Sequence, residues 1–525
     1  MPLIRPVAAL VFVLAIAAYY FARLTTTFGT AWDDGLYLVG GAAISQGDGY
    51  RLIQDPEAPF CLLFPPLYPA VLSLVWLLWP QFPDNLWAFK SLNIVAGVVA
   101  LGLIGALVTR VYQALRAVGV LTAVLLALSP LYHHFIDTTM SEMIFMPLVL
   151  LGLLATERFV ADTRPRAPWL WLGVALLAAL PVYTRTAGLA LGISVIGCLI
   201  MHRRLKAAAG FMVAYAAAGL PWFWWISHVK RTGAASTLNN ASWFYSHTGG
   251  FAPDTLLATL SANTQAIFQT ALPLVLLPSM ASGYGRGVLT KYHLEGIAIA
   301  IVIAAIALFL VGLVASLRKR LRVFHLYLLV SVLMILPYPL ADAVRYMMAL
   351  SPLILYCLAE GIVWLARGNW LGPWRDSVRH QALAVGLAAV VVALGLAEGL
   401  HQVANLVQAR AGHGATLTDG RRPYNDDLAS AAGWIRAHAP ANAVLLYYRD
   451  PQLYLLTRRS TIAGVEAGRF DRALRLAKTQ PVYLVHVADT DGEANYQRFL
   501  ALDTVDHVKC YTAPHRLFTI YQIRS

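Results

Sequence analysis

The chain has 525 residues, of which 58% are hydrophobic and 13% charged, and its mean hydropathy is +0.61. Soluble domains carry about 25% charged residues, so this composition excludes a soluble globular protein and predicts an integral membrane protein built from helices. The net charge of +13 does not indicate nucleic acid, because Lys and Arg collect in the cytoplasmic loops of membrane proteins.

The apolar runs predict the membrane segments in chain order. They fall at about 6–24, 67–80, 86–109, 117–136, 140–158, 168–183, 187–201, 207–226, 294–316, 323–340, 346–366 and 381–400. The first run lacks a small-residue cleavage site and predicts a retained helix, not a cleaved signal peptide. The run at 67–80 is short and lies between Pro66 and Pro80, so we expect it to lie in the membrane interface without crossing.

The distribution of Lys and Arg predicts the orientation. If 67–80 does not cross, the basic loops all fall on the side of Arg5, namely those at 110–116, 158–166, 203–206, 318–322 and 367–379. The opposite short turns then hold only Arg185 and Arg345. Because basic loops stay in the cytoplasm, we predict about 11 crossings, with the N-terminus inside and the C-terminus outside.

On this topology three regions lie outside the membrane: 25–85, 227–293 and 401–525. The last region gains charge and alternates between helical and extended patterns, with helices expected at 426–439 and 451–458 and strands at 443–448 and 481–487. The chain is therefore predicted to be an all-α polytopic membrane domain, residues 1–400, followed by a small α/β extramembrane domain, residues 401–525.

Several charged residues gather at the predicted outer face. They are the pair Asp33 and Asp34, Lys90, Asp137, Glu142, Arg185 and Arg345, the last followed by Tyr346. Arg and Lys at the lipid–water boundary suit a phosphate, and a nearby carboxylate can take a proton from an attacking hydroxyl. Asp33, Glu142 and Asp137 are alternatively candidate ligands for a divalent metal ion.

Each of these residues also has an ordinary structural explanation. Asp33 and Asp34 could cap a helix starting near Gly35, and Glu142 could favour a helix N-terminus through the helix dipole. Arg185 and Arg345 could be boundary residues that reach toward water, and Tyr346 could be a packing residue. These alternatives stay open at the level of the sequence.

The ordered set of short motifs resembles the GT-C superfamily of glycosyltransferases, in the branch of protein O-mannosyltransferases and lipid A aminoarabinose transferases. The motifs are Trp32-Asp33-Asp34-Gly35-Leu36-Tyr37, Gly47-Asp48-Gly49-Tyr50, Pro65-Pro66-Leu67-Tyr68, Ser141-Glu142, Thr184-Arg185, Pro221-Trp222 and Arg345-Tyr346 with Pro352. The resemblance covers about residues 5–366. The sequence differs from the aminoarabinose transferases at Phe64, where those enzymes have Lys. This difference disfavours aminoarabinose as the sugar.

The resemblance implies an inverting sugar transfer from a polyprenyl-phosphate donor to an acceptor hydroxyl outside the bacterial inner membrane. It gives Asp33, Asp34 and Glu142 catalytic roles, with Asp33 as general base. It makes Arg185, Lys90, Arg345, Tyr346 and Tyr68 contacts for the lipid phosphate or substrate.

The sequence leaves the sugar, the acceptor (a lipid, a glycan or a protein) and metal dependence open. Two other functions also stay open, a transporter or flippase of a lipid-linked saccharide and a non-catalytic envelope assembly factor. A transporter would favour an internal repeat and charges near the bilayer midplane, and the sequence shows neither.

Overall fold

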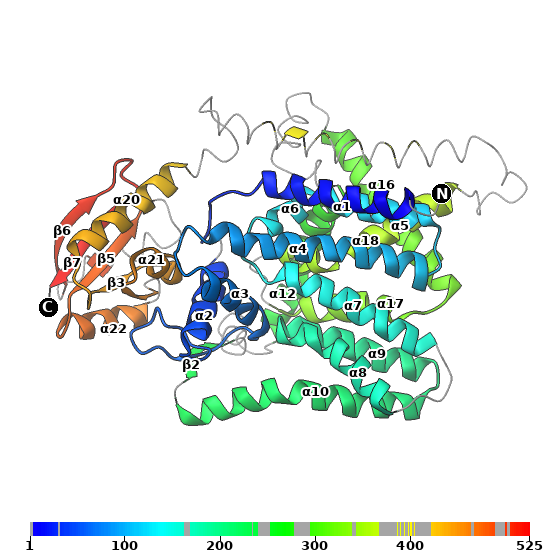
Figure 1. Ribbon diagram of the computed structural model, residues 1–525, viewed down its shortest axis with the longest axis horizontal. Coiled ribbons are helices and arrows are strands. Elements are labelled where there is room, and N and C mark those ends of the chain that lie inside the picture. Colours follow the sequence, from blue (N-terminus) through cyan, green and yellow to red (C-terminus); the bar gives the residue numbers. More distant parts are fainter. Residues whose placement is uncertain are drawn as a thin grey trace, which may run out of the picture.

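The computed structural model consists of a bundle of apolar helices with a small sheet domain at one end (Figure 1). It describes residues 4–29, 32–161, 168–233, 235–239, 253–277, 295–338, 343–366, 422–463, 467–488, 499–500 and 505–524, with scattered residues between 386 and 404. One hydrophobic core joins the helices of the bundle, and two smaller clusters stabilise the sheet domain.

Five helical segments are long and apolar enough to span a membrane. They are Leu86–Val111 (α4, Leu86–Ala106, with a π-helical end), α7 (Glu142–Ala161), α10 (Leu205–Thr232), α16 (Glu295–Lys319) and Ala343–Leu365 within α18 (Ala343–Ala366). A sixth is formed if α5 (Arg116–Ala127) and α6 (Pro130–Ile136), which are bent by 60°, make one broken span. These segments correspond to six of the predicted apolar runs, and they confirm a membrane protein built from helices.

The predicted number of eleven crossings is not confirmed. Five further apolar helices have fewer than 20 residues, α1 with 19 and the other four with 10–17. At about 1.5 Å per residue the four shorter helices do not reach across the roughly 30 Å hydrocarbon core, whereas α1 nearly does. The five belong to α1 (Ile4–Ala22), α3 (Leu67–Leu78), α8 (Pro168–Ala179) with the 3₁₀ turn after it, α9 (Leu189–Met201) with the turn before it, and α17 (Val323–Ile335). The run at 381–400 lies almost entirely outside the described residues.

The first predicted outer region forms a short helical hairpin against the bundle. Helix α2 (Trp32–Gln46) packs on α3, and a Cβ added to Gly41 would lie 3.1 Å from both Leu72 Cβ and the Pro69 carbonyl oxygen. The run at 67–80 is thus a helix, as predicted, and it is too short to span. Strand β1 (Phe60–Leu62) pairs in parallel with β2 (Ala235–Asn239), so the first and second outer regions are joined by backbone hydrogen bonds.

Helices α16 and α18 approach each other closely through two glycines. A Cβ on Gly312 would lie 1.8 Å from the Cys357 carbonyl oxygen, and one on Gly361 would lie 2.0 Å from that of Leu308. Small residues allow helix backbones to pack closely in membranes, where the hydrophobic effect does not drive association. This contact fixes α18, whose first turn carries Arg345 and Tyr346. The second outer region adds α12 (Pro253–Ala266) and α13 (Leu272–Leu276), and α13 packs on α18.

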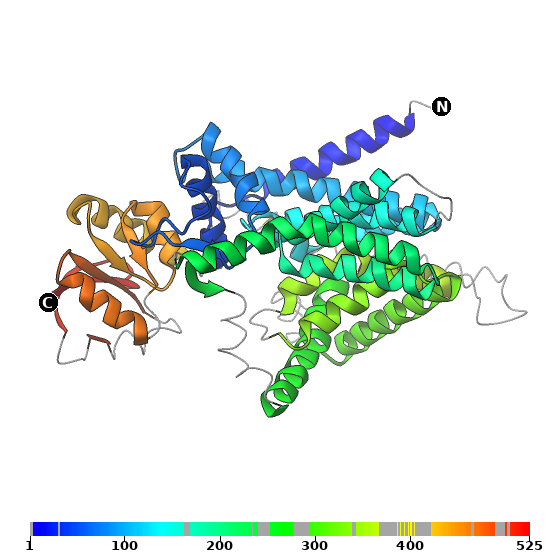
Figure 2. The same ribbon diagram turned by 90° about the horizontal axis from the view of Figure 1, so that it is seen from below.

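The C-terminal region is the predicted small α/β domain. Its five-stranded sheet has the order β4-β3-β5-β7-β6, with β4, β3 and β5 parallel and β7 and β6 antiparallel to their neighbours. The strands are β3 (Val444–Leu446), β4 (Ser460–Ile462), β5 (Val482–Val487), β6 (Asp506–Thr512) and β7 (Phe518–Arg524); the helices are α20 (Arg422–His438), α21 (Asp450–Thr457) and α22 (Ala467–Ala477). The four predicted elements are confirmed, and β4, β6, β7 and α22 are additions. Figures 1 and 2 both show this domain next to α2 and α3, at one end of the bundle.

Candidate functional site

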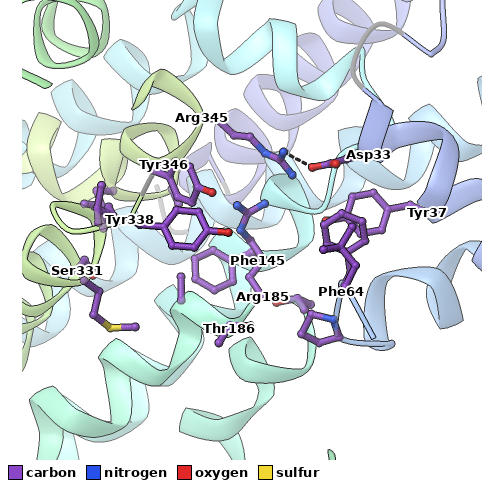
Figure 3. A pocket seen from close by; sticks show the side chains of 18 of the residues that line it. Asp33, Tyr37, Phe64, Phe145, Arg185, Thr186, Ser331, Tyr338, Arg345 and Tyr346 are labelled. Atoms are coloured by element: carbon purple, nitrogen blue, oxygen red, sulfur yellow. Dashed lines mark hydrogen bonds and ion pairs between the residues drawn. The ribbon is translucent and has the colours of Figure 1, made fainter. Parts of the chain in front are cut away.

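A cavity of about 440 Å³ lies where α2, the turn between α8 and α9, α17 and α18 meet. Its wall is mostly apolar and aromatic, and the charged residues that line it are Asp33, Arg185 and Arg345. Figure 3 shows Tyr37 and Phe64 on the side of Asp33, and Tyr338 and Tyr346 on the opposite side. Mostly apolar pockets of this size with a few placed polar groups are typical of small-molecule sites.

Four of the predicted residues form one connected chain of ion pairs. Arg345 donates through Nη1 to Asp33 Oδ2 and through Nε to Glu142 Oε1. Arg185 donates to the same Glu142 oxygen at 2.6 Å. The sequence predicted that carboxylates and cations converge on the outer face of the membrane domain. The structure brings together side chains as far as 312 residues apart in the sequence.

Glu142 lies beneath the two arginines and not on the cavity wall. Its side chain has no exposed area, whereas those of Arg185 and Arg345 are 12% and 16% exposed. A carboxylate in this position holds the two guanidinium groups in place, because buried charges need partners. Glu142 is therefore better placed to position Arg185 and Arg345 than to contact a substrate in the cavity.

Arg185 reaches the cavity from an irregular turn. It is an extended residue between two 3₁₀ turns, Leu180–Tyr183 and Thr186–Gly188. A Cβ on Gly188 would lie 2.4 Å from the Pro181 carbonyl carbon, so the tight turn requires glycine there. Arg185 Nη1 also donates to Ser141 Oγ at 3.1 Å, and its guanidinium lies 5.6 Å from the ring centre of Tyr346.

The two aspartates at the start of α2 have different surroundings. The helix begins at Trp32, so both lie in its first turn, and the alternative that they cap a helix starting near Gly35 does not hold. Asp33 lines the cavity, but Asp34 is 1% exposed and does not, and Thr139 Oγ1 donates to its carbonyl oxygen at 3.5 Å. Asp34 is therefore not placed to meet a substrate in this cavity, and the structure lends no support to the catalytic role predicted for it.

Lys90 and Asp137 belong to a separate buried cluster. Lys90 Nζ lies 3.0 Å from Asp137 Oδ1 and donates to the Thr25 carbonyl oxygen at 2.7 Å. Asp137 also accepts hydrogen bonds from Thr25 N at 2.8 Å and Thr25 Oγ1 at 2.7 Å. Neither residue lines the cavity, so this pair fixes the chain that leads into α2 and the predicted phosphate contact of Lys90 is not supported.

Tyr68 lies behind the cavity wall. Its ring packs edge-on against Tyr37 with 5.1 Å between ring centres, and its hydroxyl donates to Asn93 Oδ1 at 3.4 Å. Tyr37 itself lines the cavity, its hydroxyl lies 3.0 Å from Ser141 Oγ, and burial raises the pKa of this phenol. Tyr68 thus supports Tyr37, and the direct substrate contact predicted for Tyr68 is not supported.

The candidate metal ligands do not form a metal site. Asp33 and Glu142 face the same guanidinium, and Asp137 is paired with Lys90 in the separate cluster. In the described part of the chain, no group of three His, Cys, Asp or Glu residues is placed to hold a metal ion. Asp33 and Glu142 are therefore arranged to bind arginine, and Asp137 is arranged to bind lysine.

The structure adds aromatic residues that the sequence reasoning did not assign to the site. Trp32, Phe145 and Tyr338 all line the cavity. The one available signal was the position of Trp32 next to Asp33. Phe145 and Tyr338 sit in apolar runs, where an aromatic residue more often packs in the core. Phe64, which stands where aminoarabinose transferases have Lys, packs on Tyr37 with 4.6 Å between ring centres.

Comparison with known proteins places the fold. No protein-family model and no curated protein sequence matches the chain. Among solved structures, ArnT from Cupriavidus metallidurans in the apo state is similar with a TM-score of 0.57 and 14% identity, covering 99% of this chain and 98% of ArnT. The same ArnT bound to undecaprenyl phosphate gives 0.55 and 14%, covering 98% and 97%.

A third similar structure is the Archaeoglobus fulgidus oligosaccharyltransferase tethered with an acceptor peptide. It has a TM-score of 0.55 and 11% identity, covering 97% of this chain and 73% of the oligosaccharyltransferase. These proteins are glycosyltransferases of the GT-C superfamily, and ArnT represents the lipid A aminoarabinose transferase branch. The chain therefore has the fold of the GT-C glycosyltransferases, as its ordered motifs indicated.

Proposed function

We propose that this protein is a membrane glycosyltransferase that moves a sugar from a polyprenyl-phosphate donor to an acceptor hydroxyl. The observation that carries the proposal is the series of ion pairs that links Asp33, Arg345, Glu142 and Arg185 beside a cavity, within a GT-C fold. Two similar structures support a donor of this class, because ArnT is bound to undecaprenyl phosphate and an archaeal oligosaccharyltransferase to dolichol phosphate.

The two arginines of this series of ion pairs can stabilise a phosphate as it leaves the sugar. Among the described residues, Arg185 bonds to Ser141 and Glu142 only through Nη1. Its remaining N–H groups offer a planar fork to a phosphate at the cavity. In this proposal Arg185, assisted by Arg345, neutralises the charge that develops on the leaving polyprenyl phosphate, which is a main source of catalysis in such sites.

Asp33 is the proposed general base. The acceptor hydroxyl oxygen attacks the anomeric carbon, the bond from that carbon to the phosphate oxygen breaks, and Asp33 takes the hydroxyl proton. Arg345 holds Oδ2 of Asp33, which orients the carboxylate at the cavity wall. Oδ1 is then the oxygen that accepts the proton. Attack opposite to the leaving phosphate inverts the anomeric configuration.

The location of the protein is part of the same proposal. Basic loops on the side of Arg5 favour an inner membrane protein with a cytoplasmic N-terminus and a C-terminal domain on the outer side. We place the domain boundary near residue 400, where the composition changes. The cavity, whose lining residue Trp32 contacts the C-terminal domain, would then face acceptors outside the cytoplasm.

The test is sugar transfer by the purified protein in lipid. Polyprenyl-phosphate sugars are supplied one at a time with crude cell envelope as acceptor, and release of free polyprenyl phosphate is followed. We expect release from one donor and a loss of roughly 10²–10⁴-fold in Asp33→Asn, the usual range for a placed base.

The matched control for this test is Asp84→Asn. It changes an exposed acid of the same outer region outside the cavity lining, and it should keep wild-type activity. Full activity in Asp33→Asn would contradict the role of Asp33. Lipid reorientation without release from any donor would support a flippase instead.

A further inference from the structure

One hydrogen bond joins the cavity wall to the C-terminal domain. The indole Nε1 of Trp32 donates to Asp450 Oδ1 at 2.7 Å, across 418 residues of sequence. Trp32 lines the cavity and precedes Asp33 in the first turn of α2. Asp450 begins α21 and is only 5% exposed. The C-terminal domain therefore touches the side chain next to the proposed base.

Asp450 is built into a wider contact with the first outer region. Its Oδ2 accepts a hydrogen bond from Gln54 Nε2 at 3.2 Å, and its carbonyl oxygen accepts one from Thr461 Oγ1 at 2.8 Å. Thr461 N in turn donates to the Gln54 carbonyl oxygen at 2.7 Å. Both carboxylate oxygens thus face donors from the first outer region, and the position of the carboxylate is fixed from both sides.

The segment entering α2 is held by α21 and by the residue just before it, Arg449. Arg449 Nη1 donates to the Gly29 carbonyl oxygen at 2.6 Å, and Gln452 Nε2 donates to that of Phe28 at 3.0 Å. Gly29 has a φ of +68°, and a Cβ there would lie 2.4 Å from Gln452 Cδ. This close approach requires glycine and leaves the segment little freedom to shift.

Helix α2 itself also rests on α21. A Cβ on Gly35 would lie 2.9 Å from Pro451 Cβ, so the first turn of α2 packs directly on the first turn of α21. Gln452 is supported from behind, since its Oε1 accepts hydrogen bonds from the hydroxyls of Tyr447 at 3.3 Å and Tyr424 at 3.5 Å. The contact is continuous from the core of the sheet domain to the cavity wall.

We propose that Asp450 is a positioning residue of the active site, and that the C-terminal domain completes the site by holding Trp32. This inference rests on the proposed glycosyl transfer. The Asp450 carboxylate fixes the indole as part of the cavity wall and thereby the direction of Asp33 one residue later. Asp450 does not line the cavity and so does not touch the substrate.

The placement of Asp33 determines the rate of proton removal, whereas the donor phosphate is proposed to bind Arg185 on another element. Loss of the bond should therefore lower kcat and leave the KM for the donor within about threefold of wild type. A shift of about 1 Å in a reacting group can cost on the order of 10²-fold in rate. We expect a 10- to 100-fold loss of kcat in Asp450→Leu and a similar loss in Trp32→Phe.

The experiment combines these variants with a rescue and a control. The double variant Trp32→Phe/Asp450→Leu should be no slower than the slower single variant, because both remove the same bond. Asp450→Asn keeps an acceptor oxygen for the indole and should stay within about threefold of wild type. Arg472→Ala is the matched control: it breaks the pair with Asp55, at 2.7 and 2.8 Å, which joins the same two regions away from the cavity.

Several results would overturn the inference. They are an unchanged kcat in Asp450→Leu, an additive double variant, or an equal loss in Arg472→Ala, which would indicate general loss of domain contact. If wild type transfers no sugar, the proposed function fails. The positioning role is then decided by amide hydrogen exchange, which should accelerate in the first turns of α2 in Asp450→Leu but not in Arg472→Ala. Unchanged exchange in α2 would overturn the positioning role.

Discussion

At the scale of single residues, the site is defined by which charges share a partner. Two arginines converge on the fully buried Glu142, and one of them continues to Asp33. Lys90 is equally buried, but its partner is Asp137, in another cluster. Burial makes these pairings exclusive, because a charge inside the protein is stable only with its partner in place. The pairing therefore separates residues that act at the cavity from residues that support the chain.

Glu142→Gln tests the positioning role of the shared carboxylate. Removing its charge leaves two buried guanidinium groups with one carboxylate, and breaking a buried pair in this way costs about 3–5 kcal/mol. We expect a lower unfolding temperature in detergent and a kcat at least about 10-fold lower, because the arginines lose their common anchor.

Glu157→Gln, on the same helix α7, is the matched control. Glu157 Oε1 accepts a hydrogen bond from the Phe324 backbone N–H at 3.1 Å, and an amide oxygen can replace it. This variant should keep its activity. Wild-type stability and kcat in Glu142→Gln would show that the arginines are held by other groups.

At the scale of elements, each site residue depends on the start of a helix or on a turn. Asp33 lies in the first turn of α2, Glu142 begins α7, Arg345 lies in the first turn of α18, and Arg185 lies in the turn before α9. Helix starts favour carboxylates through the helix dipole, which explains Asp33 and Glu142 but not Arg345. Arg345 is positioned by packing of α18 on α16 and by its ion pairs.

Gly312→Ala tests this packing. The added Cβ would lie 1.8 Å from the Cys357 carbonyl oxygen, so α16 and α18 must move apart. Overpacking of this kind typically costs about 1–3 kcal/mol. We expect a lower unfolding temperature together with slower sugar transfer, since α18 carries Arg345 to Asp33 and Glu142.

Gly296→Ala, also in α16, is the control because a Cβ there meets nothing within 4 Å. In a helix this change favours folding by roughly 0.5–1 kcal/mol, so the two substitutions should shift the unfolding temperature in opposite directions. Equal shifts in both variants would indicate that the contact between α16 and α18 is loose.

At the scale of the whole molecule, the C-terminal domain lies at one end of the bundle (Figures 1 and 2), and it reaches the cavity wall through the bond from Trp32 to Asp450. The domain contacts the first outer region through hydrogen bonds and through the ion pair between Arg472 and Asp55. These bonds raise the pKa of Arg472, whose guanidinium is charged at physiological pH in any case. The arrangement requires the domain to lie on the same side of the membrane as the cavity.

The native cysteines provide a test of this orientation. Cys61, Cys198 and Cys357 are buried, and Cys510 in the C-terminal domain is partly exposed. We expect a membrane-impermeant maleimide to label the protein in intact spheroplasts and Cys510→Ser to abolish the labelling. A cysteine placed at Lys206, in a predicted cytoplasmic loop, should react only after permeabilisation in the Cys510→Ser background. The reverse pattern would invert the proposed topology.

The sequence by itself determined the class of protein and the kinds of group at the site. Long apolar runs imply helices in a membrane, because only such segments can satisfy the backbone in lipid. The types and order of Asp33, Glu142, Arg185 and Arg345 indicated phosphate and proton chemistry. Four elements of the C-terminal domain, α20, β3, α21 and β5, were also visible in local patterns, whereas β4, α22, β6 and β7 were not.

Only the tertiary structure decided which of these groups meet. Asp33 and Arg345 are 312 residues apart, and Trp32 and Asp450 are 418 apart, so no local pattern could pair them. Lys90 and Arg345 are both cations near helix starts, yet packing assigns one to Asp137 and the other to Glu142. The sign of each charge can be read from the sequence, but the ion-pair partner of a buried charge depends on how the helices pack around it.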